Sequence, residues 1–117
     1  MTMAQDLFVG EKVLAFDLET TGVSTNNDRI VQFVLIGTLE DGTPVNREQI
    51  VKPGVRIPYD ASQIHGIYDV DVRDKPTLSE VADELAEFIE GAILVGHNVR
   101  SFDYAMLKTE LLRLGRL

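Results

Sequence analysis

Apolar residues recur along the chain with two periods, and these predict a mixed α/β fold. Residues 13–18 (VLAFDL) and 30–39 (IVQFVLIGTL) are short apolar runs, as expected of buried strands. An Asp-Gly pair at 41–42 is a strong hairpin signal, so residues 45–52 should pair antiparallel with the second strand. This third strand is polar at alternate positions and follows Pro44, which suits the edge of a sheet.

The second half of the chain predicts helices around one more strand. Residues 60–68 (DASQIHGIY) form a short helical turn, and TLSE at 77–80 is a capping box. The capping box opens a helix that Gly91 should end. Its apolar positions recur at helical spacing: Leu78, Val81, Ala82, Leu85, Phe88 and Ile89. Residues 92–95 follow as a short buried strand and residues 101–114 as a last helix, which gives the order strand, strand, strand, helix, strand, helix.

Length and composition narrow the class of protein. The 117 residues suffice for one modest domain, which we expect to cover residues 1–117. The chain has no cysteine, which excludes disulfides and thiolate sites, and no apolar run approaches the roughly 18 residues of a membrane span. We therefore expect a cytoplasmic protein. Because the net charge is −8, contact with nucleic acid phosphates should be local or metal-mediated.

Two acidic residues stand at the end of the first predicted strand. Asp17 and Glu19 are two positions apart, so on a strand they project from the same face. Buried carboxylates need a paired cation, neutralisation by a pKa shift or a bound metal ion, and no Lys or Arg lies between Lys12 and Gly22. Oxygen ligands without an adjacent His or Cys suit Mg²⁺ or Mn²⁺. The alternative is a pair of solvated carboxylates at a frayed strand end.

A third acidic residue follows the fourth predicted strand. The segment GHNVRSFD (96–103) leads from a glycine turn into the last helix and places Asp103 in its first turn. Taken alone, Asp103 would only complement the helix macrodipole. If the first and fourth strands are neighbours, their carboxyl ends lie side by side, where open α/β sheets build sites. Asp17, Glu19 and Asp103 could then converge on one divalent site.

Three motifs carry a resemblance to a known family. FDLETTG (16–22), IHGI (64–67) and LVGHNVRSFDYAML (94–107) resemble, in the same order, the motifs of the DnaQ-like 3′-5′ exonucleases, the DEDD family in its DEDDh form. The resemblance implies an RNase H-like mixed sheet, with an antiparallel three-stranded start followed by helix, strand and helix. It also implies hydrolysis of terminal phosphodiesters of DNA or RNA with two Mg²⁺ or Mn²⁺ ions.

The same resemblance assigns the site residues. Asp17 would bridge both metal ions, Glu19 would ligate the ion that activates water, and Asp103 would help to hold the other. The residues that match substrate-binding positions are Thr20, Thr21, Gly22, Ile64, His65 and Asn98. Alternatives remain: the 20–22 segment is equally an ordinary turn, His65 a structural hydrogen-bonder, and Asn98 a brace of its own loop.

The resemblance is incomplete at the C-terminal end. The family's third motif, a His followed five residues later by an Asp, does not occur before Leu117. We therefore expect a domain truncated before its fifth strand, whose open sheet edge takes a second copy or a completing partner chain. A catalytically inactive nucleic-acid-binding or interaction module of the same fold is the main alternative function. Another RNase H-like phosphodiesterase is a third, which the IHGI segment disfavours.

Overall fold

The computed structural model describes residues 10–96 and 102–115. Its elements in chain order are β1 (Val13–Thr20), β2 (Ile30–Thr38), β3 (Pro44–Ile50), α2 (Tyr59–His65), α3 (Asp69–Val72), α4 (Leu78–Ile89), β4 (Ile93–Val95) and α5 (Tyr104–Arg113). The predicted order is confirmed. Helix α3 was not predicted, because four residues are too few to show a helical period. Within the described ranges, no helix is long and apolar enough to cross a membrane.

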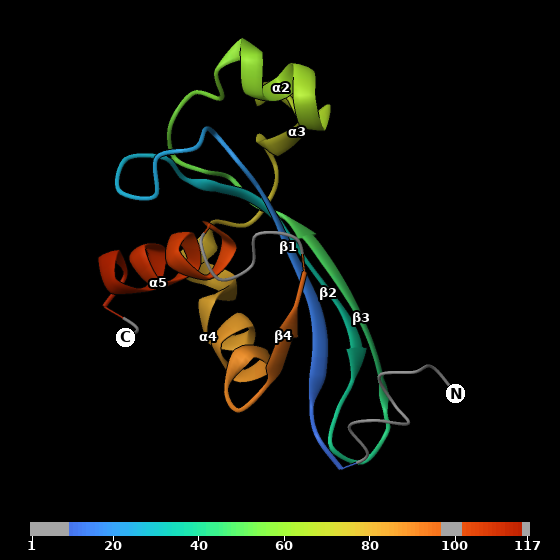
Figure 1. The fold of residues 1–117 in the computed structure, drawn as a ribbon. Coiled ribbons are helices and arrows are strands. Elements are labelled where there is room, and N and C mark those ends of the chain that lie inside the picture. Colours follow the sequence, from blue (N-terminus) through green and yellow to red (C-terminus); the bar gives the residue numbers. More distant parts are fainter. Residues whose placement is uncertain (1–9, 97–101, 116–117) are drawn as a thin grey trace.

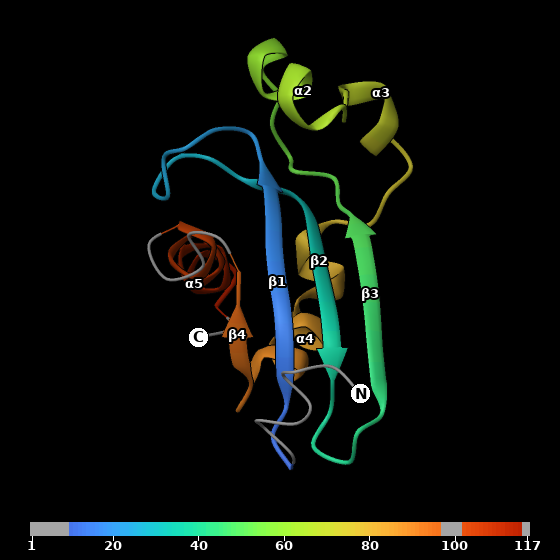
Figure 2. The ribbon, with the colours of Figure 1, turned by 45° about the vertical axis from the view of Figure 1, so that its right-hand side comes forward.

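The strands form one sheet in the order β3-β2-β1-β4 (Figures 1 and 2). β2 pairs antiparallel with both β1 and β3, whereas β4 lies parallel to β1. The predicted Asp-Gly hairpin is confirmed, with Gly42 at a φ of 85°. β3 is an edge strand, as predicted, but it ends at Ile50 and not at Lys52, which forms an isolated bridge with Thr77. The α/β class with an antiparallel three-stranded start is therefore confirmed.

Side chains alternate between two unlike faces along β1. Leu14, Phe16 and Leu18 are buried in the main core, to which α4 and α5 contribute. Figure 1 shows both helices on one side of the sheet. Ala15 and Asp17 point to the opposite face, where they are exposed. No helix of the described part of the chain covers that face, so the acidic residues of β1 lie on an open surface.

Lys12 joins the first strand to the end of α4. Its side chain is buried, with a relative exposure of 8%, and its Nζ donates to the carbonyls of Glu87, Phe88 and Glu90 at 3.0, 3.0 and 2.6 Å. The last carbonyls of a helix have no partner within it, and a cation complements the negative end of its dipole. Lys12 therefore caps α4.

Replacing Lys12 by Met keeps an apolar stem but removes the donor from three main-chain carbonyls. We expect the free energy of unfolding to fall by about 1–3 kcal/mol, because buried acceptors lose their partner. Urea unfolding measures this change. Lys108→Met, at an exposed position of α5, is the matched control and should change stability by less than about 0.5 kcal/mol. Equal effects of the two substitutions would show that the cap does not stabilise the protein.

Candidate active site

The structure brings Asp17 and Glu19 together at the end of the central strand. They lie on the same face of β1, Asp17 exposed and Glu19 half-buried. Burial raises the pKa of Glu19, the neighbouring charge of Asp17 raises it further, and His65 lowers it. An irregularity in the β1–β2 register falls directly after Glu19, so the regular ladder is interrupted just beyond the acidic pair. Two carboxylates in this relation favour a proton or a cation between them.

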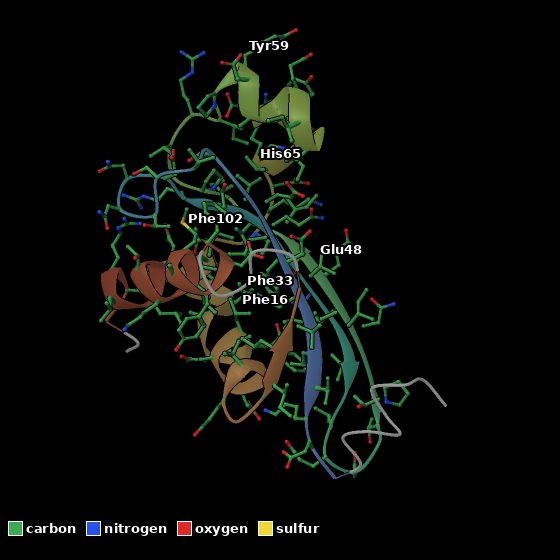
Figure 3. All side chains as sticks on the ribbon, viewed as in Figure 1. Phe16, Phe33, Glu48, Tyr59, His65 and Phe102 are labelled. Atoms are coloured by element: carbon green, nitrogen blue, oxygen red, sulfur yellow. The ribbon has the colours of Figure 1, made fainter. Side chains whose placement is uncertain are left out.

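His65 connects α2 to the end of β1. Its Nδ1 accepts from the main-chain N–H of Ile67 at 3.1 Å, which assigns the ring proton to Nε2. Nε2 lies 3.1 Å from the carbonyl oxygen of Thr20 and donates to it. Both ring nitrogens of His65 therefore make structural hydrogen bonds. This agrees with the alternative that His65 is a structural residue and does not bind substrate. Figure 3 shows His65 at the inner end of α2, whereas Tyr59 lies at its outer end.

The 20–22 turn is braced by a residue that the sequence analysis missed. The Thr21 hydroxyl accepts from Arg29 N–H and donates to Asp28 Oδ1, both at 2.9 Å. Thr20 Oγ1 donates to the Gly22 carbonyl at 2.6 Å. A Cβ on Gly22 would lie 2.5 Å from Asp28 Oδ2, so a larger residue here would displace the carboxylate that bonds Thr21. Asp28 gave no signal because acidic residues are common in polar loops.

Two exposed apolar residues are neighbours in sequence of the turn and of His65, which bonds to it. Val23, directly after the turn, is 89% exposed, and Ile64 on α2 is 85% exposed. Ile64 was predicted as a substrate-binding residue, whereas Val23 was not. The signal for Val23 was an isolated apolar residue within a polar turn.

Asp103 lies at the start of α5, as predicted, and is buried with a relative exposure of 3%. Because β4 is parallel to β1, the carboxyl ends of both strands face the same end of the sheet. Within residues 10–96 and 102–115, no three Asp, Glu or His side chains form a group that could hold a metal ion. The described geometry thus pairs Asp17 with Glu19 but does not add Asp103, whose convergence with them stays a prediction. Asn98 lies outside the described residues.

Comparisons with known proteins agree on one family. The model of the RNase T family, described as exonuclease, matches residues 14–117. DNA polymerase III subunit epsilon of Treponema pallidum is 35% identical over 97 residues, which cover 83% of this chain and 45% of that protein. The PolC-type DNA polymerase III of Clostridium perfringens is 35% identical over 107 residues, which cover 91% of this chain and 7% of that protein.

The fold also matches solved structures. E. coli exonuclease I, in complex with a dT13 oligonucleotide, superimposes with a TM-score of 0.76 at 22% identity, over 89% of this chain and 24% of that one. This likeness confirms the RNase H-like fold. The chain spans less than half the length of each of these relatives.

Replacing Asp17 by Asn removes a negative charge beside Glu19 and should lower the pKa of Glu19 toward its ordinary value. A raised pKa means that the folded protein holds this proton more tightly than the unfolded chain does. Glu19 therefore contributes stability below its unfolded pKa, and this contribution is lost as the pH rises through its folded pKa. NMR titration of the carboxyl groups, without divalent ions, measures the pKa of Glu19 in the wild-type chain and in Asp17→Asn. Asp41→Asn, in the distant hairpin, is the control. An unchanged Glu19 titration in Asp17→Asn would contradict the coupling.

Proposed function

We propose that the chain forms part of a metal-dependent 3′-5′ exonuclease that acts on terminal phosphodiesters of DNA or RNA. The chain belongs to the exonuclease family whose model it matches. The observation that carries this proposal is the Asp17–Glu19 pair on the open face of β1. The relatives support DNA as substrate, since they are DNA polymerase III proteins and an exonuclease solved with an oligonucleotide. The activity of the whole protein belongs to this proposal, because the chain spans only part of its relatives.

The donor set at the end of β1 fits a divalent cation. Asp17 and Glu19 offer only oxygen atoms, and the pKa of Glu19 is raised first by burial and then by the neighbouring charge of Asp17. Mg²⁺ and Mn²⁺ prefer such ligands. Asp17 and Glu19 would hold metal here, and Asp103 is the predicted third ligand. When bound, a pair of such ions supplies an activated water and stabilises the leaving oxygen.

The protein's own contribution is to position the terminal nucleotide. Thr21 N–H already donates to Arg29 O at 2.9 Å, so the amides of Gly22 and Val23 are the donors in this turn that can face a ligand. His65 fixes the carbonyl of Thr20 from the other side. The exposed Ile64 side chain would pack against the base. Held in this way, the terminal phosphodiester would lie beside the carboxylates of β1.

A catalytically inactive nucleic-acid-binding module is the second candidate. The observation that favours it is the absence of a three-carboxylate group among the residues the structure describes. In this case the 20–22 turn and Ile64 would bind a 3′ end, and Asp17 and Glu19 would hold a cation that bridges to phosphate. Hydrolysis distinguishes the two functions, whereas binding of metal and of 3′ ends is common to both.

We also propose that the outer edge of β4 accepts a further strand, from a second copy or from a completing partner chain. β4 ends the sheet of the described residues, which leaves one side of its backbone without a strand partner. A groove of about 430 Å³ runs beside it between α4 and α5. Its lining is mainly apolar and includes Ile89, Ala92, Leu94, Leu107 and Leu111. An added strand could bury side chains in this groove while it pairs with β4.

Titration with Mn²⁺ should raise the melting temperature of the chain, because a ligand that binds only the folded state stabilises it. Asp17→Ala should abolish this rise, whereas Asp41→Ala should keep it. In a form that also carries the third motif, we expect mononucleotide release from 3′ ends that stops with EDTA and is lost on Asp17→Ala or Asp103→Ala. Metal binding that is unchanged in Asp17→Ala would contradict the proposed site. Binding of 3′ ends without hydrolysis in the longer form would favour the inactive module.

Sedimentation velocity over a range of protein concentrations should show self-association of the 117-residue chain through the β4 edge. Tyr104→Lys places a charge in the lining of the groove and should weaken this association. Tyr59→Lys, at an exposed tyrosine on α2 away from the groove, is the control. A monodisperse monomer at all concentrations would contradict self-association, and equal effects of the two substitutions would place it elsewhere on the surface.

A further inference from the structure

A buried ionic cluster, not used by the proposed chemistry, links α5 to the loop between β1 and β2. Glu110 on α5 has a relative exposure of only 5%. Its Oε1 accepts from Arg113 Nη1 at 2.5 Å and lies 3.9 Å from Arg29 Nε. Arg113 Nη2 donates to the carbonyl of Asn26 at 2.8 Å. Glu110 therefore connects α5 to Arg29 at the end of the loop, and its partner Arg113 connects α5 to Asn26 within the loop.

Glu110 shares a helix face with the predicted metal ligand of α5. Asp103 and Glu110 are seven residues apart, about two helical turns, and both are buried. Met106, Leu107 and Leu111 lie buried along the same stripe. The stripe fixes α5 against the sheet, with Asp103 at one end of the helix and Glu110 near the other.

The loop that Glu110 contacts carries the candidate nucleotide-binding turn. Arg29 is bonded directly to this turn, since Thr21 N–H donates to Arg29 O and Arg29 N–H donates to Thr21 Oγ1. Figure 1 shows α5 lying beside this loop, below it in that view. A shift of Arg29 would therefore displace Thr21 and its neighbours. Arg113 restrains the opposite side of the loop at Asn26.

The physical chemistry of the cluster favours positioning over simple stability. Burial raises the pKa of Glu110, and the charges of Arg113 and Arg29 lower it. Arg29 Nε is itself buried and has no hydrogen-bond partner among the described residues, so its charge is compensated at 3.9 Å by Glu110. Replacing a buried ion pair by apolar side chains is often neutral or stabilising, whereas directional charges can fix one arrangement of segments.

We propose that Glu110 is a positioning residue of the nuclease site: through Arg29 and Arg113 it sets the place of the 20–22 turn relative to Asp103. This inference rests on the proposed function, because it concerns the site at which a 3′ end would bind. Glu110 touches no reacting group. Its role is to hold the turn where the amides of Gly22 and Val23 meet the terminal nucleotide.

The test compares Glu110→Gln and Arg113→Gln with Glu84→Gln, a control at a more exposed salt bridge. Glu84 makes a salt bridge of 2.8 Å with Arg47, which joins α4 to β3 away from the turn. Amide hydrogen exchange measures how strongly the backbone N–H groups of residues 21–29 are protected from exchange with solvent. We expect exchange about tenfold faster in both cluster variants and unchanged exchange in the control. Arg113→Gln keeps the test open if Glu110→Gln does not fold, because Arg113 is less buried.

A second measurement separates positioning from general stability. With Mn²⁺ present, the wild-type chain should bind a linear oligo-dT more tightly than a circular oligo-dT, because only the linear strand has a 3′ end. We expect the cluster variants to lose most of this preference, well below their melting temperatures, and the control to keep it. The role of Glu110 would be overturned if the cluster variants matched Glu84→Gln in the amide exchange of residues 21–29 or in the preference for linear oligo-dT. If the wild-type chain bound linear and circular oligo-dT equally, the proposed function itself would be overturned. Faster amide exchange of residues 21–29 in the variants would then still show that the Glu110 cluster holds this loop.

Discussion

The alternation of side chains along β1 is the constraint on which the rest of the structure depends. Its core face carries Leu14, Phe16 and Leu18, which bring α4 and α5 onto one side of the sheet. The same alternation obliges Asp17 and Glu19 to share the other face. A shift of one residue in register would bury both carboxylates in the core and expose three apolar side chains. The requirement for a dry core therefore also fixes the position of the acidic pair.

Local signals in the sequence predicted most of the fold. The Asp-Gly hairpin and the capping box of Thr77 and Glu80 each depend on a few adjacent residues, and both are confirmed. The interactions that were missed join residues far apart in the chain. Lys12 bonds carbonyls 75 to 78 positions away, and Arg113 bonds Asn26 at a separation of 87. A charged residue met in sequence gives no sign of which distant segment its side chain will reach.

In the candidate site, too, the local part could be predicted from the sequence and the part that depends on tertiary packing could not. Asp17 and Glu19 were predicted to lie together because a strand has a fixed period, and the structure pairs them. Convergence of this pair with Asp103 is a prediction that depends on how α5 is placed, which no local pattern specifies. In the structure this placement involves the stripe of α5 and its ionic cluster at Glu110. Motifs thus identify the chemical groups, whereas tertiary packing determines the distances between them.

The negative net charge of the chain limits how the acidic pair could bind a phosphate group. A protein of charge −8 repels a polyanion at long range, but salt screens this repulsion beyond about 10 Å at 0.1 M ionic strength. Attraction to a phosphate must therefore arise within the site. Asp17 and Glu19 cannot supply it as bare carboxylates, since they add to the repulsion. One divalent ion held between them would cancel their two negative charges, and a second ion would make the site positive. The proposed function therefore implies that binding of a 3′ end at the β1 face, like hydrolysis, would require the metal.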